Sequence, residues 1–426
     1  MAETHARAAK QTFFRQSGWM MITSVAAGVF MFAVHLCFSK AIGNAEYGVF
    51  TTLLSILYFI GIPSVSLQMV FTRQAAFSMT ESQQRGLTRA VRSVGLSVIL
   101  IWLAVALGVL IWQQQVLQTL HLSATALWVT IATAAVTMSK PMFFGVLQGK
   151  QDFLWLGWAA ILAGVGRFLA VAIFVLAFGG GASAVMLGAL CGELTAVLVA
   201  VVRTRKTWLG RAEPILWRPW LAKMIPLTLG FAAFQFVYTA DPMFVSIFLE
   251  PSQRGSYGAA GTLSRALVLF TGQLPLVMFP KLVRSVAAAQ KTDMFKLALI
   301  STALLAGLGA AFISYVLPIG IRMYYKPFEA GIPLLPPFTA AMAVLTVANV
   351  LINNLLAHER FQAVPWLVLV AVAYGLAVMY RFHQSTEQII YTLGVFSILL
   401  VSVALYFTWR AQRVTTGSMP PPEAPR

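Results

Sequence analysis

An acid and a proline interrupt a long hydrophobic run at Tyr238-Thr239-Ala240-Asp241-Pro242-Met243. The run begins near Phe231 and ends in the short polar link Leu249-Glu250-Pro251-Ser252-Gln253-Arg254-Gly255. A second apolar run then opens with Ser256-Tyr257-Gly258-Ala259-Ala260-Gly261. Because proline has no backbone N–H, Pro242 leaves a carbonyl free one turn earlier, near Tyr238. This carbonyl could coordinate a cation, or the helix could bend there under load.

The same order of features occurs once before, in the first half of the chain. An apolar run over residues 30–39 is followed by the polar link 40–46 and by a second run that opens with Tyr47-Gly48. Tyr47 and Tyr257 are 210 positions apart, and prolines 63 and 275 follow at a similar offset. Leu147-Gln148-Gly149-Lys150 and Leu356-Ala357-His358-Glu359-Arg360 keep nearly the same spacing. The shared offset indicates that the second half copies the first, although Asp241 has no acidic counterpart near Phe32.

The composition is that of a membrane protein. Hydrophobic residues make up 59% of the 426 residues, charged residues only 10%, and the mean hydropathy is +0.80, whereas soluble domains carry about 25% charged residues. Backbone groups in lipid must be hydrogen-bonded within their own segment, so apolar runs of about 20 residues are helices. We count twelve such runs: 17–39, 48–70, 93–112, 124–147, 154–177, 184–202, 221–248, 258–280, 297–317, 332–357, 365–381 and 390–409.

The predicted fold is therefore all-α, with twelve transmembrane helices arranged as two six-helix bundles. A parallel pseudo-two-fold repeat relates the bundles, because both begin on the same side of the membrane. We expect a cytoplasmic N-terminal segment (1–16), the first bundle (17–202), a cytoplasmic linker (203–220), the second bundle (221–409) and a disordered cytoplasmic tail (410–426). In the linker, Trp and Arg residues alternate, which suits either a plain connection or a stretch lying among lipid headgroups.

The net charge of +17 follows the membrane topology. Most of the 30 lysines and arginines fall in links on one side, and such links are cytoplasmic. This bias predicts a multi-pass membrane protein with both termini in the cytoplasm, and it disfavours nucleic-acid binding. No metal-ligand spacing, phosphate loop or catalytic triad stands out, so we expect a protein that is not an enzyme. Cys37 and Cys191 lie in apolar runs and are expected to pack as small hydrophobic residues.

Three short motifs give this chain a family resemblance. The seventh run carries an acid and is followed by Gly255-Ser256-Tyr257-Gly258-Ala259-Ala260. Gly43-Asn44-Ala45-Glu46-Tyr47-Gly48 is the counterpart in the first half, and Leu147-Gln148-Gly149 closes the fourth run. With twelve runs, this pattern resembles the polysaccharide-biosynthesis flippases of the multidrug/oligosaccharidyl-lipid/polysaccharide (MOP) exporter superfamily. The link after the second run does not fit the signature of the major facilitators, which also have twelve spans.

The resemblance implies a flippase of the bacterial inner membrane that moves a polyprenyl-pyrophosphate-linked oligosaccharide from the inner to the outer leaflet by alternating access. Its substrate would be an undecaprenyl-pyrophosphate-linked glycan, an O-antigen or exopolysaccharide repeat unit. Membrane lipids, a polysaccharide polymerase and glycosyltransferases would be its partners, with no nucleic acid. No cofactor is expected, apart from coupling to Na⁺ or H⁺. The alternatives are a cation-coupled multidrug exporter of the same superfamily, a non-transporting member of a polysaccharide synthesis complex, and a membrane enzyme of glycan assembly.

Charged side chains within the first bundle are the first candidate site residues. Inserting an ionisable group at the bilayer centre costs about 2.5–3.5 kcal/mol, so each such residue needs a structural or functional reason. Arg167 and Glu193 lie in the middle of consecutive spans and either form a structural ion pair or hold a pyrophosphate, with Glu193 positioning Arg167. A guanidinium binds phosphate oxygens in a bidentate manner and stays charged. Lys140 either extends to the inner headgroups or contacts phosphate. The expected cavity is cationic on balance.

Asp241 and Arg265 are the candidates in the second bundle. We expect Arg265 to face the cavity, beside the small residues Gly261 and Ser264, and Asp241 to be the site of cation coupling. Protonation or Na⁺ binding would remove the carboxylate charge and so change its affinity for a cationic cavity. The alternative is that Asp241 and Arg265 only pair with each other.

Polar side chains on apolar helices supply candidate sugar contacts. His35 lies in the first span, and Asn349 and Asn353 are four residues apart and share one face of the tenth. Their alternative role is to hydrogen-bond neighbouring helices, at about 0.6 kcal/mol for each bond. The many aromatic residues could also stack on sugars, although packing is their usual role.

Overall fold

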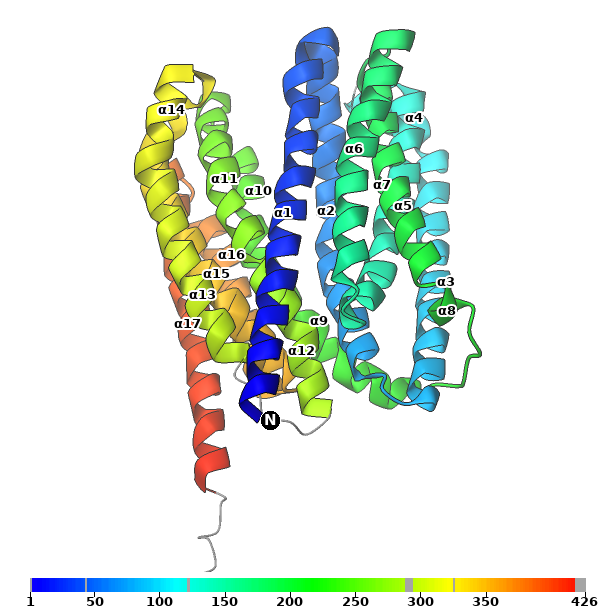
Figure 1. The fold of residues 1–426 in the computed structure, drawn as a ribbon. Coiled ribbons are helices and arrows are strands. Elements are labelled where there is room, and N and C mark those ends of the chain that lie inside the picture. The colour runs from blue at the N-terminus through cyan, green and yellow to red at the C-terminus, as the bar shows by residue number, and fades with distance from the viewer. Residues whose placement is uncertain (1, 43, 121–122, 288–293, 325, 418–426) are drawn as a thin grey trace, which may run out of the picture. The chain divides into compact units, whose positions relative to one another are not determined.

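The computed structural model describes residues 2–42, 44–120, 123–287, 294–324 and 326–417, and within these ranges it contains helices and no strand (Figure 1). By its internal contacts the chain divides into two units. The N-terminal unit comprises Met1–Met224 and Val283–Ala288, and the C-terminal unit comprises Ile225–Leu282 and Ala289–Arg426.

Long helices that reverse direction at short links build the N-terminal unit (Figure 1). They are α1 (Ala2–Ile42), α2 (Asn44–Phe77), α3 (Glu81–Ile111), α5 (Ala124–Gly149), α6 (Phe153–Phe178) and α7 (Ala182–Arg203), with the short helices α4 (Gln113–Leu120) and α8 (Arg205–Trp208). The closest packing occurs between α6 and α7, between α2 and α5, and between α1 and α6. Thr80 begins α3 with a capping box that it forms with Gln83, which satisfies backbone donors at the helix start.

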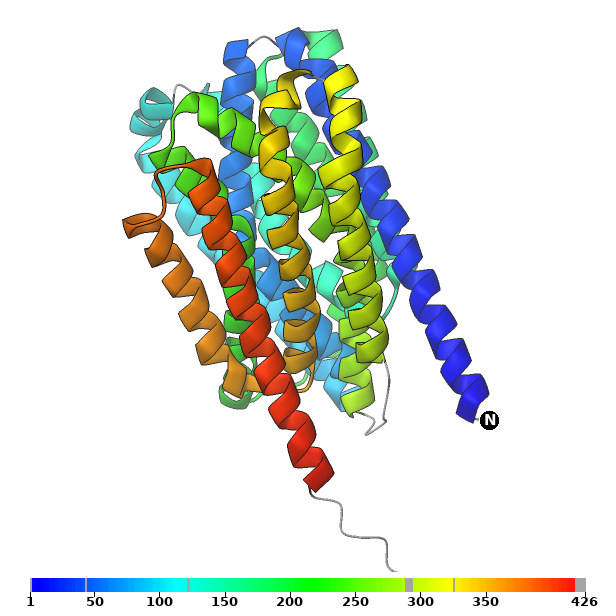
Figure 2. The same ribbon diagram turned by 90° about the vertical axis from the view of Figure 1, so that its left-hand side faces the viewer.

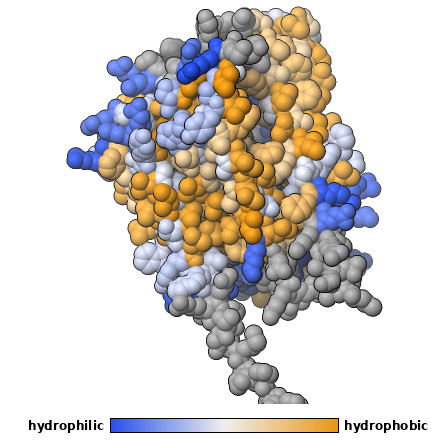
Figure 3. Space-filling model, turned by 60° about the vertical axis from the view of Figure 1, so that its left-hand side comes forward, coloured by the Kyte–Doolittle hydropathy of each residue, from blue (hydrophilic) through white to orange (hydrophobic). Residues whose placement is uncertain are grey.

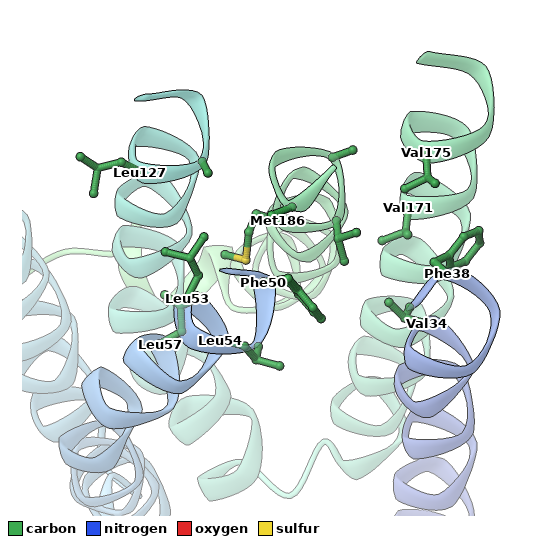
Figure 4. Close-up of a cluster of buried hydrophobic side chains, with 14 of the residues drawn as sticks. Val34, Phe38, Phe50, Leu53, Leu54, Leu57, Leu127, Val171, Val175 and Met186 are labelled. Carbon is green, nitrogen blue, oxygen red and sulfur yellow. The ribbon is translucent and has the colours of Figure 1, made fainter. Parts of the chain in front are cut away.

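The core of this unit lies where five of its helices meet (Figure 4). Helices α1, α2, α5, α6 and α7 each contribute aliphatic or aromatic side chains to it, including Val34, Phe50, Leu127, Val171 and Met186. Val171 and Met186 have no exposed surface. Since lipid tails are as apolar as these side chains, close packing of their shapes holds the helices together more than exclusion of water does.

The C-terminal unit takes in most of α9 (Trp217–Thr239), whose first residues belong to the N-terminal unit. The following elements are α10 (Asp241–Phe248), α11 (Pro251–Thr271), α12 (Gln273–Ala287), α13 (Met294–Ala311), the π-helical turn η1 (Phe312–Val316), α14 (Leu317–Tyr324), the 3₁₀ segment η2 (Lys326–Leu334), α15 (Leu335–Ala357), η3 (Phe361–Ala363), α16 (Val364–Tyr380) and α17 (Thr386–Gly417). Helix α15 packs against α11, α13 and α17, and α16 lies beside α17 (Figure 2).

Two links repeat the same turn in the two units. The chain leaves α5 through Gln151, with a φ of 62°, and leaves α15 through Glu359, with a φ of 55°. The flanking hydrogen bonds also match: Asp152 N donates to Leu147 O at 2.9 Å, and Arg360 N donates to Leu355 O at 3.0 Å. Positive φ is uncommon for a residue other than glycine. The repeat predicted from sequence offsets is thus present in the backbone, 208 positions apart.

Eleven helices in the described part of the chain are long and apolar enough to cross a membrane. The predicted second span, 48–70, falls within α2. Hydrophobic residues make up most of the middle of the face seen in Figure 3. The helices also extend beyond the predicted spans: the polar link predicted between the second and third spans is mostly helical, because α2 continues to Phe77 and α3 starts at Glu81.

The helices at the two ends of the chain extend beyond the predicted spans. From Ala2 on, the segment predicted at 1–16 belongs to the same helix as the first span, α1. Helix α17 continues past residue 410, where the predicted disordered tail begins, to Gly417. Adding residues to a helix that has already formed costs little, so both helices extend until a residue stops them. Residues 418–426 lie outside the described ranges.

Candidate functional site

Asp241 lies at the break between α9 and α10. Helix α9 ends at Thr239, Ala240 intervenes, and Asp241 begins α10 with Pro242 behind it. The break lies where the missing N–H of Pro242 would have bonded the carbonyl of Tyr238. The Asp241 side chain has no exposed surface. A discontinuous helix therefore carries a fully buried carboxyl group inside the C-terminal unit.

Two donors from α11 converge on one oxygen of this carboxylate. Both the Tyr257 hydroxyl and the Arg265 guanidinium donate to Asp241 Oδ2. Among the described residues, the other oxygen, Oδ1, has no hydrogen-bond partner and is buried. The structure thus contains the ion pair that the sequence left open as the alternative for Arg265, rather than a guanidinium that simply lines a cavity. Asp241 keeps one acceptor that is out of contact with water.

The position of the guanidinium depends on a glycine and an aromatic ring. Arg265 lies over the ring of Phe338, with its Cζ 5.3 Å from the ring centre. A Cβ at Gly261 would lie 2.5 Å from Arg265 Nη1 and 3.2 Å from the Phe338 ring. A larger residue at this place would force the guanidinium to shift. The small-residue face that the sequence predicts beside Arg265 therefore accommodates the arginine itself.

Tyr374 from α16 supplies a second buried oxygen. Its ring packs edge-on against Phe236 and Phe244, and its side chain has no exposed surface. Its hydroxyl has no hydrogen-bond partner within the described residues, and it is close enough to Asp241 for the two to interact electrostatically. Buried polar atoms without a partner are uncommon and call for an explanation. A proton or a small cation could satisfy Asp241 Oδ1.

An apolar groove runs beside this break. It has a volume of about 450 Å³ and lies between α9–α10 and α16. Thirteen residues line it, all of them apolar: Leu229, Ala232, Ala233, Phe236, Ala240, Met243, Phe244, Val368, Ala371, Val372, Gly375, Leu376 and Met379. Because Ala240 is among them, the wall of the groove includes the residue next to Asp241. A change of angle at the break would change the shape of this groove.

In the N-terminal unit, Glu193 forms an ion pair with Lys140. Lys140 Nζ lies 2.7 Å from Glu193 Oε2, and the two side chains are 28% and 20% exposed. The sequence predicts Arg167 as the partner of Glu193, so this prediction needs correction. Lys140 comes from α5, which packs against α7, and its long stem allows the ammonium to reach the carboxylate. The pair neutralises the lysine that was proposed as a phosphate contact.

Arg167 lies against the backbone of α7 instead. A Cβ at Gly192 would lie 2.7 Å from Arg167 Cβ, so this glycine allows α6 and α7 to approach closely. Arg167 is 7% exposed, and its Cζ lies 5.8 Å from the centre of the Phe50 ring of α2. His35 packs on the same ring, with 5.5 Å between ring centres. Arg167, Phe50 and His35 thus form one buried group, which the sequence did not connect.

The two asparagines of α15 bond to each other. Asn353 Nδ2 donates to Asn349 Oδ1 at 2.7 Å and to Asn349 O at 2.8 Å. Asn353 is 2% exposed. Their common face is as predicted from the spacing of four residues, and their hydrogen bonds remain within one helix.

Sequence reasoning did not identify Tyr257 and Tyr374 as site residues, although both lie close to Asp241. Tyr257 appeared only as part of a motif, and its 16-residue separation from Asp241 gives no sign of a hydrogen bond. Tyr374 is one tyrosine in an apolar span, and no signal in the sequence marks it. Sequence reasoning also missed a contact in the N-terminal unit, at the end opposite the linker. There the Glu46 carboxylate accepts a hydrogen bond from Ala182 N at 2.7 Å. The acid in the first-half motif was the available signal for this contact.

Comparisons with known proteins bear on the arrangement of these helices. No protein-family model and no curated protein matches the sequence. Among solved structures, one described as the outward-facing conformation of a multidrug resistance MATE family transporter of the MOP superfamily aligns with a TM-score of 0.76. That alignment covers 96% of this chain and 97% of the transporter at 12% identity. This chain has the MATE transporter fold.

Other solved structures agree. A mutant of a Vibrio cholerae MATE transporter aligns with a TM-score of 0.72 at 14% identity, covering 96% of this chain and 98% of that one. A MATE in a straight conformation aligns with a TM-score of 0.72 at 12% identity, with 96% of each chain covered. The predicted all-α membrane fold with two six-helix halves is confirmed. At these identities the likeness establishes the fold and not the substrate.

Proposed function

We propose that this chain is a cation-coupled exporter that moves an organic solute across the membrane by alternating access, with Asp241 as the coupling residue. The observation that carries this proposal is the buried carboxylate at the α9–α10 break, with one oxygen that lacks a partner among the described residues. Transporters place coupling ions at interrupted helices inside the membrane, and charged side chains there generally serve transport.

The chemistry of coupling follows from the contacts of Asp241. As a carboxylate it holds Tyr257 and Arg265 on Oδ2. When Oδ1 takes a proton or a cation, the negative charge that attracts the guanidinium is cancelled. Arg265 then keeps its own charge without a counter-charge, which favours its movement away from α10. Cation binding would thus loosen the tie between α10 and α11 and allow the break to change its angle.

For the substrate, an amphiphilic organic cation of the multidrug type agrees best with the charges. Of the five intramembrane charges expected to make a cationic cavity, four form pairs of opposite sign: Lys140 with Glu193, and Arg265 with Asp241. Pairing weakens the argument for a cavity that attracts phosphate. The solved structure with a TM-score of 0.76 carries the description of a multidrug resistance transporter, which supports the same choice.

A lipid-linked oligosaccharide flippase is the second candidate, and Arg167 favours it. This guanidinium lies in the middle of α6, 7% exposed, and arginine is well suited to a pyrophosphate. The motifs around Tyr47, Leu147 and Tyr257 that resemble polysaccharide flippases point the same way. In this function the glycan would cross through the protein while the prenyl tail stays in lipid.

Transport by purified protein in proteoliposomes tests the proposal. One arm follows efflux of a fluorescent organic cation, and the other follows exposure of a labelled polyprenyl-pyrophosphate oligosaccharide on the opposite leaflet, each under an imposed H⁺ or Na⁺ gradient. We expect Asp241→Asn to abolish the response to the gradient. Glu250→Gln, the same change at an exposed acid, should retain it. If the Asp241 variant responds to the gradient like wild type, the coupling role is wrong. Transport of the glycan alone would favour the second candidate.

A further inference from the structure

The linker between α7 and α9 is fastened to the inner end of α3. We call residues 205–218 the strap. Thr88 Oγ1 donates to Thr207 O at 2.6 Å, and Arg92 donates to Trp208 O at 2.7 Å and to Gly210 O at 2.9 Å. Farther along, Glu213 N donates to Arg85 O at 3.3 Å, and its carboxylate lies 2.8 Å from Arg85 Nη1. These bonds fix one side of the strap against the helix.

The same side carries its packed side chains. Trp208 and Ile215 of the strap, with Trp220 just beyond it, pack on a buried cluster that includes Phe71, Leu87 and Met142. Trp220 Nε1 also donates to Gln74 Oε1 at 2.7 Å. The strap therefore has a defined inner face, which is satisfied by α2, α3 and α5.

The outer face of the strap combines apolar and basic side chains. Leu209 is 61% exposed, Leu216 78% and Trp217 37%. Arg205, Lys206, Arg211 and Arg218 are exposed as well. Within the described residues the side chain of none of these four takes part in an ion pair or a hydrogen bond. The acid of the strap, Glu213, is held by Arg85 and Ser82, so the outer face has no negative charge to balance its four positive charges.

The place of the strap identifies what covers this face. One candidate membrane span ends at Arg203 and the next begins at Trp217, so both ends of the strap meet the membrane boundary. Exposed Leu and Trp beside Lys and Arg form the surface of segments that lie in the headgroup layer. Anionic lipids attract each such basic residue. A soluble protein partner would not require this contact with the bilayer at both ends.

We propose that the outer face of the strap is a docking surface for anionic phospholipid headgroups of the inner leaflet. Leu209, Leu216 and Trp217 enter the interface, and the four basic side chains bind the lipid phosphates. Because the strap continues directly into α9, bound lipid fixes the inner end of the helix that breaks before Asp241. The inference is independent of which solute the protein moves.

Lipid titration of the full-length protein tests this proposal. Phosphatidylglycerol is added to the protein in phosphatidylcholine nanodiscs, and the thermal unfolding midpoint is measured with each addition. We expect Arg211→Gln/Arg218→Gln to weaken the apparent affinity by about fivefold for each charge removed, since each basic residue contributes about 1 kcal/mol near an anionic surface. Arg15→Gln/Arg89→Gln removes two exposed charges at the same end of the unit, outside the strap, and should weaken it much less.

Three outcomes would overturn the proposal. The two double variants could weaken the affinity equally, which would mean a general charge effect. Soluble glycerol phosphate could stabilise wild type as well as phosphatidylglycerol does, which would mean a site for a free anion. Finally, a spin label at Leu216→Cys, in a background with Cys37→Ser and Cys191→Ala, could be as accessible to a water-soluble relaxant in phosphatidylglycerol bilayers as in detergent. We expect the bilayer to protect this label, and the spectrum also verifies that the variant is folded.

Discussion

Among the described residues, each unit of this protein contains one ion pair within its membrane helices, and the two pairs differ in their surroundings. In the C-terminal unit, Asp241 has no exposed surface, and its partner Arg265 is 18% exposed. In the N-terminal unit, Lys140 and Glu193 are 28% and 20% exposed. Asp241 also accepts a hydrogen bond from Tyr257 and retains an oxygen without a partner among the described residues. Burial and an unused acceptor suit a switch, whereas partial exposure suits a structural tie.

The contrast between the two ion pairs is tested most directly by removing the buried cation, the Arg265 guanidinium. Arg265→Met leaves the Asp241 carboxylate buried without its counter-charge, and breaking a buried pair from one side costs about 3–5 kcal/mol. We expect the largest fall in the thermal unfolding midpoint in detergent for this variant. Adding Asp241→Asn removes the stranded charge and should recover much of the loss. An unchanged midpoint for the single variant would mean that the carboxyl is already neutral.

A substitution beside the Arg265 guanidinium should perturb this ion pair less than removing the arginine does. Gly261→Ala places a methyl group 2.5 Å from Arg265 Nη1, so the guanidinium must shift relative to Asp241. Overpacking costs about 1–3 kcal/mol, and we expect a lower midpoint together with weaker gradient-driven transport. Gly258→Ala is a matched control in the same helix, because nothing lies within 4 Å of its Cβ position. Equal behaviour of the two variants would show that the contact at Gly261 has no consequence.

The pair in the N-terminal unit should be less sensitive. Glu193→Gln removes the charge opposite Lys140, but the ammonium is partly exposed and its long stem can extend toward the headgroups. Exposed ion pairs contribute about 0–1 kcal/mol, so the midpoint should change by less than it does for Arg265→Met. A loss as large as that of Arg265→Met would show that the two pairs are energetically equivalent and would remove the contrast between the units.

The ion pair that fastens the strap should show the weakest effect and a dependence on pH. Hydrogen bonds from Arg85 and Ser82 lower the pKa of Glu213 below its usual 4.5. A lowered folded-state pKa gives stabilisation that is complete above the unfolded-state pKa and is lost as pH falls through the folded-state value. We expect hydrogen exchange of the strap to rise as pH falls below about 4.5, after correction for the intrinsic exchange rate. Glu213→Gln should lack this transition. A strap protected equally at pH 7 and at low pH would contradict this role.

The hydropathy of the sequence was sufficient to predict the helical framework. The apolar runs gave the fold class, the positions of most spans and the repeat, since burial in lipid leaves the backbone few alternatives. The free carbonyl near Tyr238 was also predictable, because Pro242 lacks the N–H that a continuous helix needs, whereas the complete break between α9 and α10 was not. Each of these predictions depends on residues that are close together in the sequence.

Contacts between helices were not predictable in the same way. The sequence suggested Arg167 as the partner of Glu193, but the rotation of each helix about its axis selects Lys140 instead. Gly192 brings the backbone of α7 against Arg167 Cβ, and Glu193 pairs with Lys140. Tyr374 lies near Asp241 but belongs to a helix more than a hundred residues later in the sequence, and no local sequence pattern predicts this proximity. The arrangement of residues around Asp241 is therefore a product of tertiary packing.

The matched turns at Gln151 and Glu359 have a consequence for engineering. Both carry positive φ, and both are flanked by corresponding hydrogen bonds, yet the residues around them have little in common: Gln148-Gly149-Lys150-Gln151-Asp152 against Leu356-Ala357-His358-Glu359-Arg360. The same backbone path is thus reached with different side chains. The two pentapeptides are nevertheless not freely exchangeable, because Ala357 brought to the position of Gly149 would place its Cβ 2.4 Å from Thr72 O. A chimera that exchanges them should keep Gly149 if α5 is to stay in contact with α2.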